Sequence, residues 1–182
     1  MAGEASQDGM TDHRGMQAME TIFAPWRMAY IRGGKPAAGC ILCRDALREE
    51  ALVVCEGKSG FIMMNRYPYT GGHLMIVPYR HLCCLGDLTP EERLELFAFQ
   101  DLSVRVLTEA MNPAGFNIGM NLGKAAGAGI DDHLHIHVVP RWIGDTNFIS
   151  VIGDLRVIPE DSVGTAVQLR PFFVKLQREV CG

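Results

Sequence analysis

The clearest alternation of polar and apolar positions in the chain lies at residues 132–141, Asp-His-Leu-His-Ile-His-Val-Val-Pro-Arg. Histidines stand at every second position, at His133, His135 and His137, and apolar residues stand between them. Strict alternation of this kind predicts a half-buried β-strand. Side chains two residues apart point to the same side of a strand, so the three imidazoles are expected in a row, about 6.6 Å apart. The apolar residues between them are expected to face the core.

Four other apolar runs predict strands, at residues 51–55, 61–65, 73–78 and 116–122. Glycine-, proline- and asparagine-containing turns separate several of these runs. The links between successive runs are short, which favours antiparallel neighbours over crossover connections. Together with the histidine segment, the pattern predicts an antiparallel sheet.

A long helix is predicted to begin at Thr89, because Thr89, Pro90 and Glu92 form the sequence of a capping box with proline at the first helical position. Apolar residues then recur every three or four positions, which predicts the stripe that packs on the sheet: Leu96, Phe99, Leu102, Val106 and Ala110. Asn112 and Pro113 are expected to end the helix. A short helical stretch is expected at 45–50 and a C-terminal helix at 171–180.

Composition limits the function classes. A chain of 182 residues with 48% hydrophobic and 21% charged residues is that of a globular protein, and the formal net charge of −4 argues against a general nucleic-acid binder. The longest apolar runs are strand-sized, so no membrane partner is expected. The first ten residues lack the apolar core of a secretion signal, which predicts a cytoplasmic protein. Residues 1–20 are expected to be a disordered tail and residues 21–182 a single domain.

The row of histidines calls for a chemical explanation. A single histidine is usually a hydrogen-bonded structural residue, but three in strict alternation beside Gly127 and Gly129 favour a chemical role. Neutral imidazoles bind metals, and an imidazole is also a nucleophile and a general acid or base near neutral pH. Ligation of one metal by all three is geometrically implausible, because the first and third would lie about 13 Å apart along the strand.

The segment His133–Val139 resembles the histidine triad (HIT) motif, in which three histidines alternate with apolar residues. The resemblance extends from about Pro25 to Pro159 and is closest to dinucleoside tetraphosphate phosphorylases and related hydrolases. Three further segments resemble that branch: residues 24–27, 127–130 and 140–148. The resemblance implies an α+β fold with a five-stranded antiparallel sheet, a long helix and a C-terminal helix, paired as a two-fold homodimer.

The resemblance also implies the chemistry. The middle histidine, His135, would attack the α-phosphorus of a small nucleotide substrate and form a nucleotidyl-histidine intermediate. Prearranged donors must then meet the charge that grows on the phosphate oxygens, and the candidates are His137, Asn121 and the backbone of the glycine-rich loop. The residues expected to bind substrate are Asn65, His73, Lys124, Gly127, Ala128 and Gly129. Asn65 has an equal alternative as a turn residue, and His73 as a strand cap.

Cys40 and Cys43 form a CxxC pair in a chain of six cysteines. In a reducing compartment such a pair is more often a metal ligand or a pair of free thiols than a disulfide. Zinc needs two more ligands, and the family resemblance implies that His81 and His133 supply them. A structural zinc is therefore expected at Cys40, Cys43, His81 and His133, whereas Cys55, Cys83, Cys84 and Cys181 are expected to be ordinary thiols.

Two departures from other branches limit the activity. Family members that hydrolyse nucleoside phosphoramidates carry a serine three residues before the triad, where this chain has Ile130. The uridylyltransferase branch carries His-Pro-His, which His135-Ile136-His137 does not match. The resemblance therefore implies cleavage of dinucleoside polyphosphates, with phosphate or water as acceptor. The alternatives are a nucleoside phosphoramidate hydrolase or another nucleotide hydrolase of the family, and a nucleotide sensor without turnover.

Overall fold

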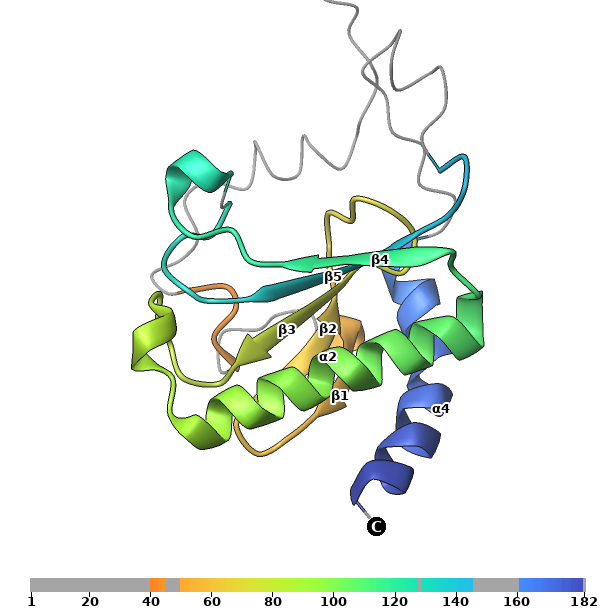
Figure 1. Ribbon diagram of the computed structural model, residues 1–182, viewed down its shortest axis with the longest axis horizontal. Coiled ribbons are helices and arrows are strands. Elements are labelled where there is room, and N and C mark those ends of the chain that lie inside the picture. Colours follow the sequence, from red (N-terminus) through yellow and green to blue (C-terminus); the bar gives the residue numbers. More distant parts are fainter. Residues whose placement is uncertain (1–39, 45–49, 128, 146–160, 182) are drawn as a thin grey trace, which may run out of the picture. The chain divides into compact units, whose positions relative to one another are not determined.

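A computed structural model describes residues 40–44, 50–127, 129–145 and 161–181 of the chain. All of them belong to one compact unit, which spans Pro36–Gly182. Five strands form one sheet in the order β1-β2-β3-β5-β4, and every neighbouring pair is antiparallel. The strands span Val53–Glu56 (β1), Gly60–Met64 (β2), Leu74–Pro78 (β3), Gly115–Gly119 (β4) and Ile136–Arg141 (β5). The α+β class and the five-stranded antiparallel sheet are thus confirmed (Figure 1).

The triad strand differs from its prediction in two respects. β5 begins at Ile136, so only His137 lies within the strand, whereas His133 and His135 lie in the segment that leads into it. Side chains of β5 are buried on both of its faces, from Ile136 to Pro140; β3 and β4 pair with its two edges, and α2 packs against it. The alternation of polar and apolar residues marks a set of buried histidines, not a side of the strand that faces solvent. A period-two pattern in the sequence is the same in both cases.

Helix α2 spans Pro90–Met111 and has the predicted start. The Thr89 hydroxyl accepts a hydrogen bond from the Glu92 backbone N–H, and the Glu92 carboxylate accepts one from the Thr89 N–H at 2.8 Å. Both bonds satisfy N–H groups that a helix start leaves unpaired. Asn112 takes a left-handed conformation at the helix end, with φ of 46°. The predicted stripe packs against β2, β3 and β5 and places this helix across the sheet (Figure 1).

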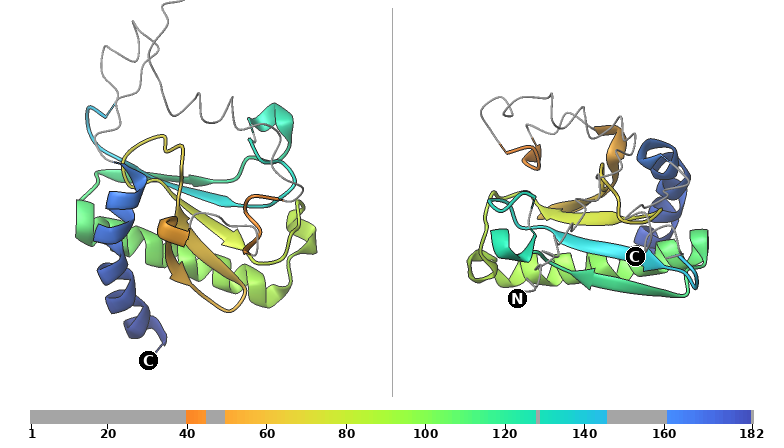
Figure 2. Two further views of the ribbon diagram at one scale, coloured as in Figure 1. Left: turned by 180° about the vertical axis from the view of Figure 1, so that it is seen from behind. Right: turned by 90° about the horizontal axis from the view of Figure 1, so that it is seen from above.

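The C-terminal helix begins earlier than predicted. Helix α4 spans Ser162–Cys181 and contains Pro171 in its interior, so the expected start at residue 171 was wrong. The Asp161 carboxylate accepts hydrogen bonds from the N–H groups of Val163 and Gly164 and caps the true start. Burial of Ala166, Leu169 and Phe173 against the sheet and α2 outweighs the hydrogen bond that an interior proline removes. Figure 2 shows α4 from two further sides.

Other expectations fall outside the described residues: the tail at 1–20, most of the helical stretch at 45–50, and the boundaries of the single domain. A 3-10 helix, η2, covers Glu50–Leu52. Among the described residues, no helix combines the length and apolarity that a membrane crossing requires. Buried apolar residues of the sheet and of helices α2 and α4 form one core, in which Phe61, Ile76 and Leu107 are fully buried.

Candidate active site and metal site

His135 is fixed in the tautomer that a nucleophile needs. Its Nδ1 lies 2.8 Å from the backbone oxygen of His133. A carbonyl oxygen only accepts hydrogen bonds, so Nδ1 carries the proton and donates it. Nε2 therefore keeps its lone pair. The side chain is buried, and its ring lies beside that of His137, with centroids 4.8 Å apart and planes at 78°.

A second chain of hydrogen bonds fixes His137. The Tyr69 backbone N–H donates to Nδ1 of His73 at 3.0 Å, which leaves the proton of a neutral His73 on Nε2. That Nε2 lies 2.9 Å from Nδ1 of His137 and donates to it. Nδ1 of His137 is then an acceptor, and the proton of a neutral His137 is on Nε2. This Nε2 is buried and has no hydrogen-bond partner among the described residues, so the site presents an unused N–H donor beside the His135 nucleophile.

Burial keeps His137 neutral. The pKa of His137 falls from 6.5 to about 4. Desolvation by burial is the larger cause, and the charge of the nearby His135 is the second. The ring of Tyr69 packs over His73 and His137, with centroids at 4.6 Å and 5.7 Å. The site thus places beside His135 an N–H donor on His137 that stays neutral at physiological pH.

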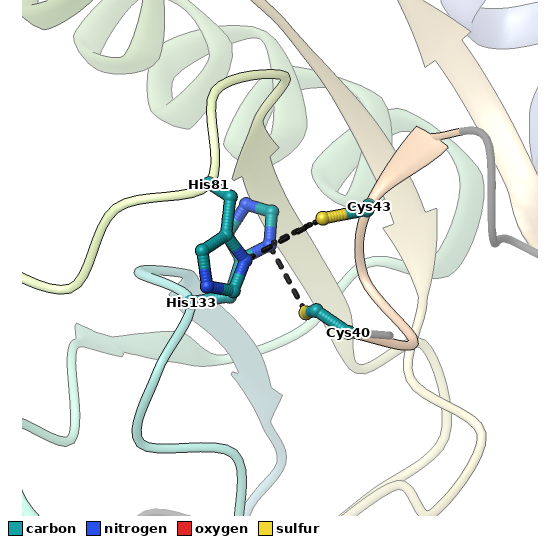
Figure 3. Close-up of side chains that lie close together, drawn as sticks. All are labelled: Cys40, Cys43, His81 and His133. Carbon is teal, nitrogen blue, oxygen red and sulfur yellow. Dashed lines mark hydrogen bonds between the residues drawn. The ribbon is translucent and has the colours of Figure 1, made fainter. Parts of the chain in front are cut away.

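The four predicted metal ligands converge on one point, although they come from three separate segments (Figure 3). One ligand atom from each of Cys40, Cys43, His81 and His133 lies within 4.8 Å of all the others. The Nδ1 atom of His133 lies 3.3 Å from Cys40 Sγ and 3.8 Å from Cys43 Sγ, and Nδ1 of His81 lies 3.4 Å from Cys43 Sγ. The row of three imidazoles is thus broken, because the first ring belongs to this cluster.

This donor set fits tetrahedral zinc. With Zn–S of about 2.3 Å and Zn–N of about 2.1 Å, neighbouring ligand atoms of a tetrahedron lie about 3.5 Å apart, close to the observed separations. Nε2 of His133 donates to the Pro78 carbonyl at 3.0 Å, so Nδ1 carries the lone pair that faces the sulfurs. Desolvation lowers the pKa of His133 and favours the neutral form that binds metals.

The remaining predicted residues divide into two groups. Asn65 joins the histidine cluster: its Nδ2 lies 3.4 Å from His73 Nδ1, while its Oδ1 accepts from the Tyr67 N–H at 2.9 Å. Its side chain therefore also has the turn role that the sequence left open. His73 lies just before β3 and is fully buried.

The other group lies on the connection between β4 and β5. It contains Asn121, Lys124, Gly127 and Gly129, and Ala128 lies outside the described residues. Lys124 is 88% exposed in its side chain, 3.9 Å from the Asp131 carboxylate. Gly127 has φ of 82°, a left-handed conformation that favours glycine.

The sequence did not point to Tyr69. Its contribution to His73 is a backbone N–H, which every residue except proline carries, and only the turn at 65–73 aims it at the imidazole. The same holds for the carbonyl of His133, which links the metal cluster to the nucleophile. Such roles belong to backbone geometry, which residue type does not encode.

Residues 47–142 match the model of the HIT domain family. The chain is 41% identical over 169 residues to AP-4-A phosphorylase of Mycobacterium tuberculosis, covering 86% of this chain and 87% of that protein. It is 33% identical over 82 residues to bis(5'-nucleosyl)-tetraphosphatase (asymmetrical) of Schizosaccharomyces pombe, covering 45% and 44%.

A solved structure of a zinc-bound histidine triad family protein from Mycobacterium smegmatis has a similar fold. Its TM-score is 0.63 at 28% identity, and the match covers 78% of this chain and 97% of that one. The extent of the family match and the similarity to the mycobacterial phosphorylase agree with the histidine geometry. The chain therefore belongs to the HIT domain family, as an enzyme of the AP-4-A phosphorylase-like kind.

Proposed function

We propose that the chain cleaves dinucleoside polyphosphates, such as diadenosine tetraphosphate, at the α-phosphate through a nucleotidyl-histidine intermediate. The observation that carries this proposal is the pairing of opposite tautomers: His135 keeps its lone pair on Nε2, while the Nε2–H of His137 is buried without a partner in the described part of the chain. A lone pair beside an N–H donor suits attack on phosphorus with a hydrogen bond to a phosphate oxygen.

In the first step, the Nε2 lone pair of His135 forms a bond to the α-phosphorus. The bond from phosphorus to the bridging oxygen breaks, and its electron pair leaves with the remaining nucleotide. As the His135 ring becomes positively charged, its Nδ1–H bond to the His133 carbonyl holds the ring and stabilises the charge. In the second step, the acceptor attacks the same phosphorus, and the electron pair of the N–P bond returns to His135.

The groups around the nucleophile are assigned supporting roles in this proposal. His137 donates Nε2–H to an oxygen of the phosphate, and His73 fixes the tautomer that makes this possible. The loop at 121–129 places Asn121, Lys124 and backbone N–H groups at the polyphosphate, where donors and positive charge are needed. Asn65 contributes on the nucleoside side.

The similarity to AP-4-A phosphorylase favours phosphate as the acceptor, whereas the similarity to the tetraphosphatase is the reason to test water. Incubation of the protein with diadenosine tetraphosphate and radiolabelled phosphate distinguishes the two. Label in ADP, with unlabelled ATP as co-product, means phosphorolysis. Unlabelled AMP and ATP mean hydrolysis. Binding of the substrate without any of these products would overturn the proposed activity and leave a nucleotide-binding protein.

We further propose that Cys40, Cys43, His81 and His133 hold one structural zinc ion. When bound, the zinc supplies a cross-link among segments far apart in sequence. Metal analysis of the purified protein is expected to give about one zinc per chain, and Cys40→Ser to lose most of it. Cys84→Ser, which lies outside the cluster, is the matched control and should keep its zinc. A metal-free, fully active and stable protein would contradict this assignment.

A homodimer is also proposed, and it rests on the family resemblance. Strand β4 stands at one edge of the sheet, and Ile118 on it is 43% exposed. An unpaired edge with an exposed apolar side chain can pair with a second copy. Light scattering at micromolar concentration should give twice the chain mass, and a strictly monomeric species would count against this.

A further inference from the structure

Cys83 and Cys84 lie on the connection between β3 and α2, outside both the active site and the metal cluster. Both are exposed, and their sulfurs are 3.4 Å apart. Adjacency in sequence does not ensure this, because consecutive side chains of an extended segment point to opposite sides. Cys84 itself is extended, with φ of −111° and ψ of 134°, as it precedes the 3-10 helix η3 at Leu85–Asp87. Two accessible thiols nevertheless lie in contact just before this helix.

The pair is not suited to the chemistry of the neighbouring cluster. Both cysteines are thiols in the structure, with sulfurs 3.4 Å apart against about 2.0 Å in a disulfide. Zinc needs four ligands, and neither sulfur belongs to the group of ligand atoms that includes His81. Two thiols without an imidazole suit a softer, three-coordinate centre. The hydrogen bond between the two thiols raises the pKa of Cys84, so its sulfur stays protonated at neutral pH.

The surroundings select the charge of a ligand. Cys83 lines a hollow of about 770 Å³ whose other walls include Asp87, Asp131 and Asp132, together with Arg80 and His81. Three carboxylates against one guanidinium leave the hollow net negative, which disfavours anionic ligands. A neutral species meets no such barrier.

We propose that Cys83 and Cys84 form a dithiol site that binds neutral compounds of trivalent arsenic. In the reaction with an arsenoxide, two As–S bonds form and the arsenic–oxygen double bond and both S–H bonds break. The two protons leave with the oxygen as water. Arsenic stays trivalent throughout, so no oxidant or reductant is needed. Its three bonds are completed by the two sulfurs and its own organic group.

The test uses the full-length, zinc-loaded protein and phenylarsine oxide, followed by intact mass spectrometry. One adduct per chain is expected, removed by a 1,2-dithiol and retained in excess glutathione. Cys83→Ser and Cys84→Ser should each lose it, while Cys55→Ala, which removes a buried thiol, should keep it. Zinc content should be unchanged in all three variants, which separates this site from the metal cluster.

A second measurement does not depend on variants. After treatment with the arsenoxide, alkylation with iodoacetamide should leave Cys83 and Cys84 protected in the wild-type protein, and peptide mapping identifies them. An adduct that survives in either serine variant, or that monothiols remove, would overturn the proposal. So would an adduct that forms only after zinc is chelated, because Cys40 and Cys43 would then be the reactive pair.

Discussion

Acidification is expected to destabilise the folded protein through His137. Burial lowers the pKa of this imidazole from 6.5 to about 4. Between these values the unfolded chain binds a proton that the folded chain does not, so the free energy of unfolding rises with pH. The contribution is fully present above about pH 6.5 and is lost as the pH falls towards 4. In the described part of the chain, the rings that face His137 are those of His135, His73 and Tyr69.

The magnitude follows from the shift. At about 1.36 kcal/mol per pKa unit, the difference between 6.5 and about 4 corresponds to at most about 3 kcal/mol. Tyr69, which packs beside the ring, is 41% exposed, so solvent screening reduces the expected loss to about 1–2 kcal/mol.

The assay is urea unfolding at a series of pH values for the wild type and His137→Asn. The Asn amide oxygen takes the place of Nδ1 as acceptor for His73, but it does not titrate. Any loss of zinc at low pH affects both proteins, so the difference between them isolates His137. Stability of the wild type should fall more steeply by about 1–2 kcal/mol between about pH 6.5 and 4. Parallel curves for the two proteins would refute this account of the buried imidazole.

Three further substitutions test the structure at separate points. His73→Phe removes the donor that fixes the His137 tautomer. It should lower kcat about 10- to 100-fold, the equivalent of about 1–3 kcal/mol, with little change in KM. Steady-state kinetics measures this, and an unchanged kcat would remove His73 from the mechanism. Thr89→Ala removes the cap of α2 and should cost about 0.5–2 kcal/mol in urea unfolding, with Thr108→Ala in the same helix as control. Gly60→Ala places a Cβ about 2.5 Å from the Val77 backbone oxygen. The two strands must shift apart, which should lower the free energy of unfolding by about 1–3 kcal/mol. A variant as stable as the wild type in urea unfolding would contradict the register of β2 and β3.

The sequence predicted the features that depend on local chemistry. The capping box at Thr89 and the apolar stripe of α2 depend on residue type and spacing, and both occur as expected. The start of α4 was missed because a proline suits a helix start, while the packing of Phe173 and Leu169 that overrides this rule is tertiary.

The metal cluster and the histidine site also combine features that the sequence predicted with features that only the folded chain determines. Family resemblance placed four ligands that come together in the structure, although they lie as far apart in the chain as Cys40 and His133. Spacing alone predicted a row of three imidazoles, and the row is broken because the first ring turns to the cysteines. The tautomers of His135 and His137 depend on a carbonyl and on a second histidine, and no pattern of residue types specifies them.

The central claim is that His135 forms the covalent intermediate. The direct measurement uses diadenosine tetraphosphate labelled at the α-phosphate, without added phosphate, quenched in alkali, where a phosphorus–nitrogen bond to histidine survives. The account predicts label on the peptide that carries His135, lost on acidification, and no label on His135→Asn that still binds nucleotide. Wild-type turnover without trapped label, or label that persists in His135→Asn, would contradict it.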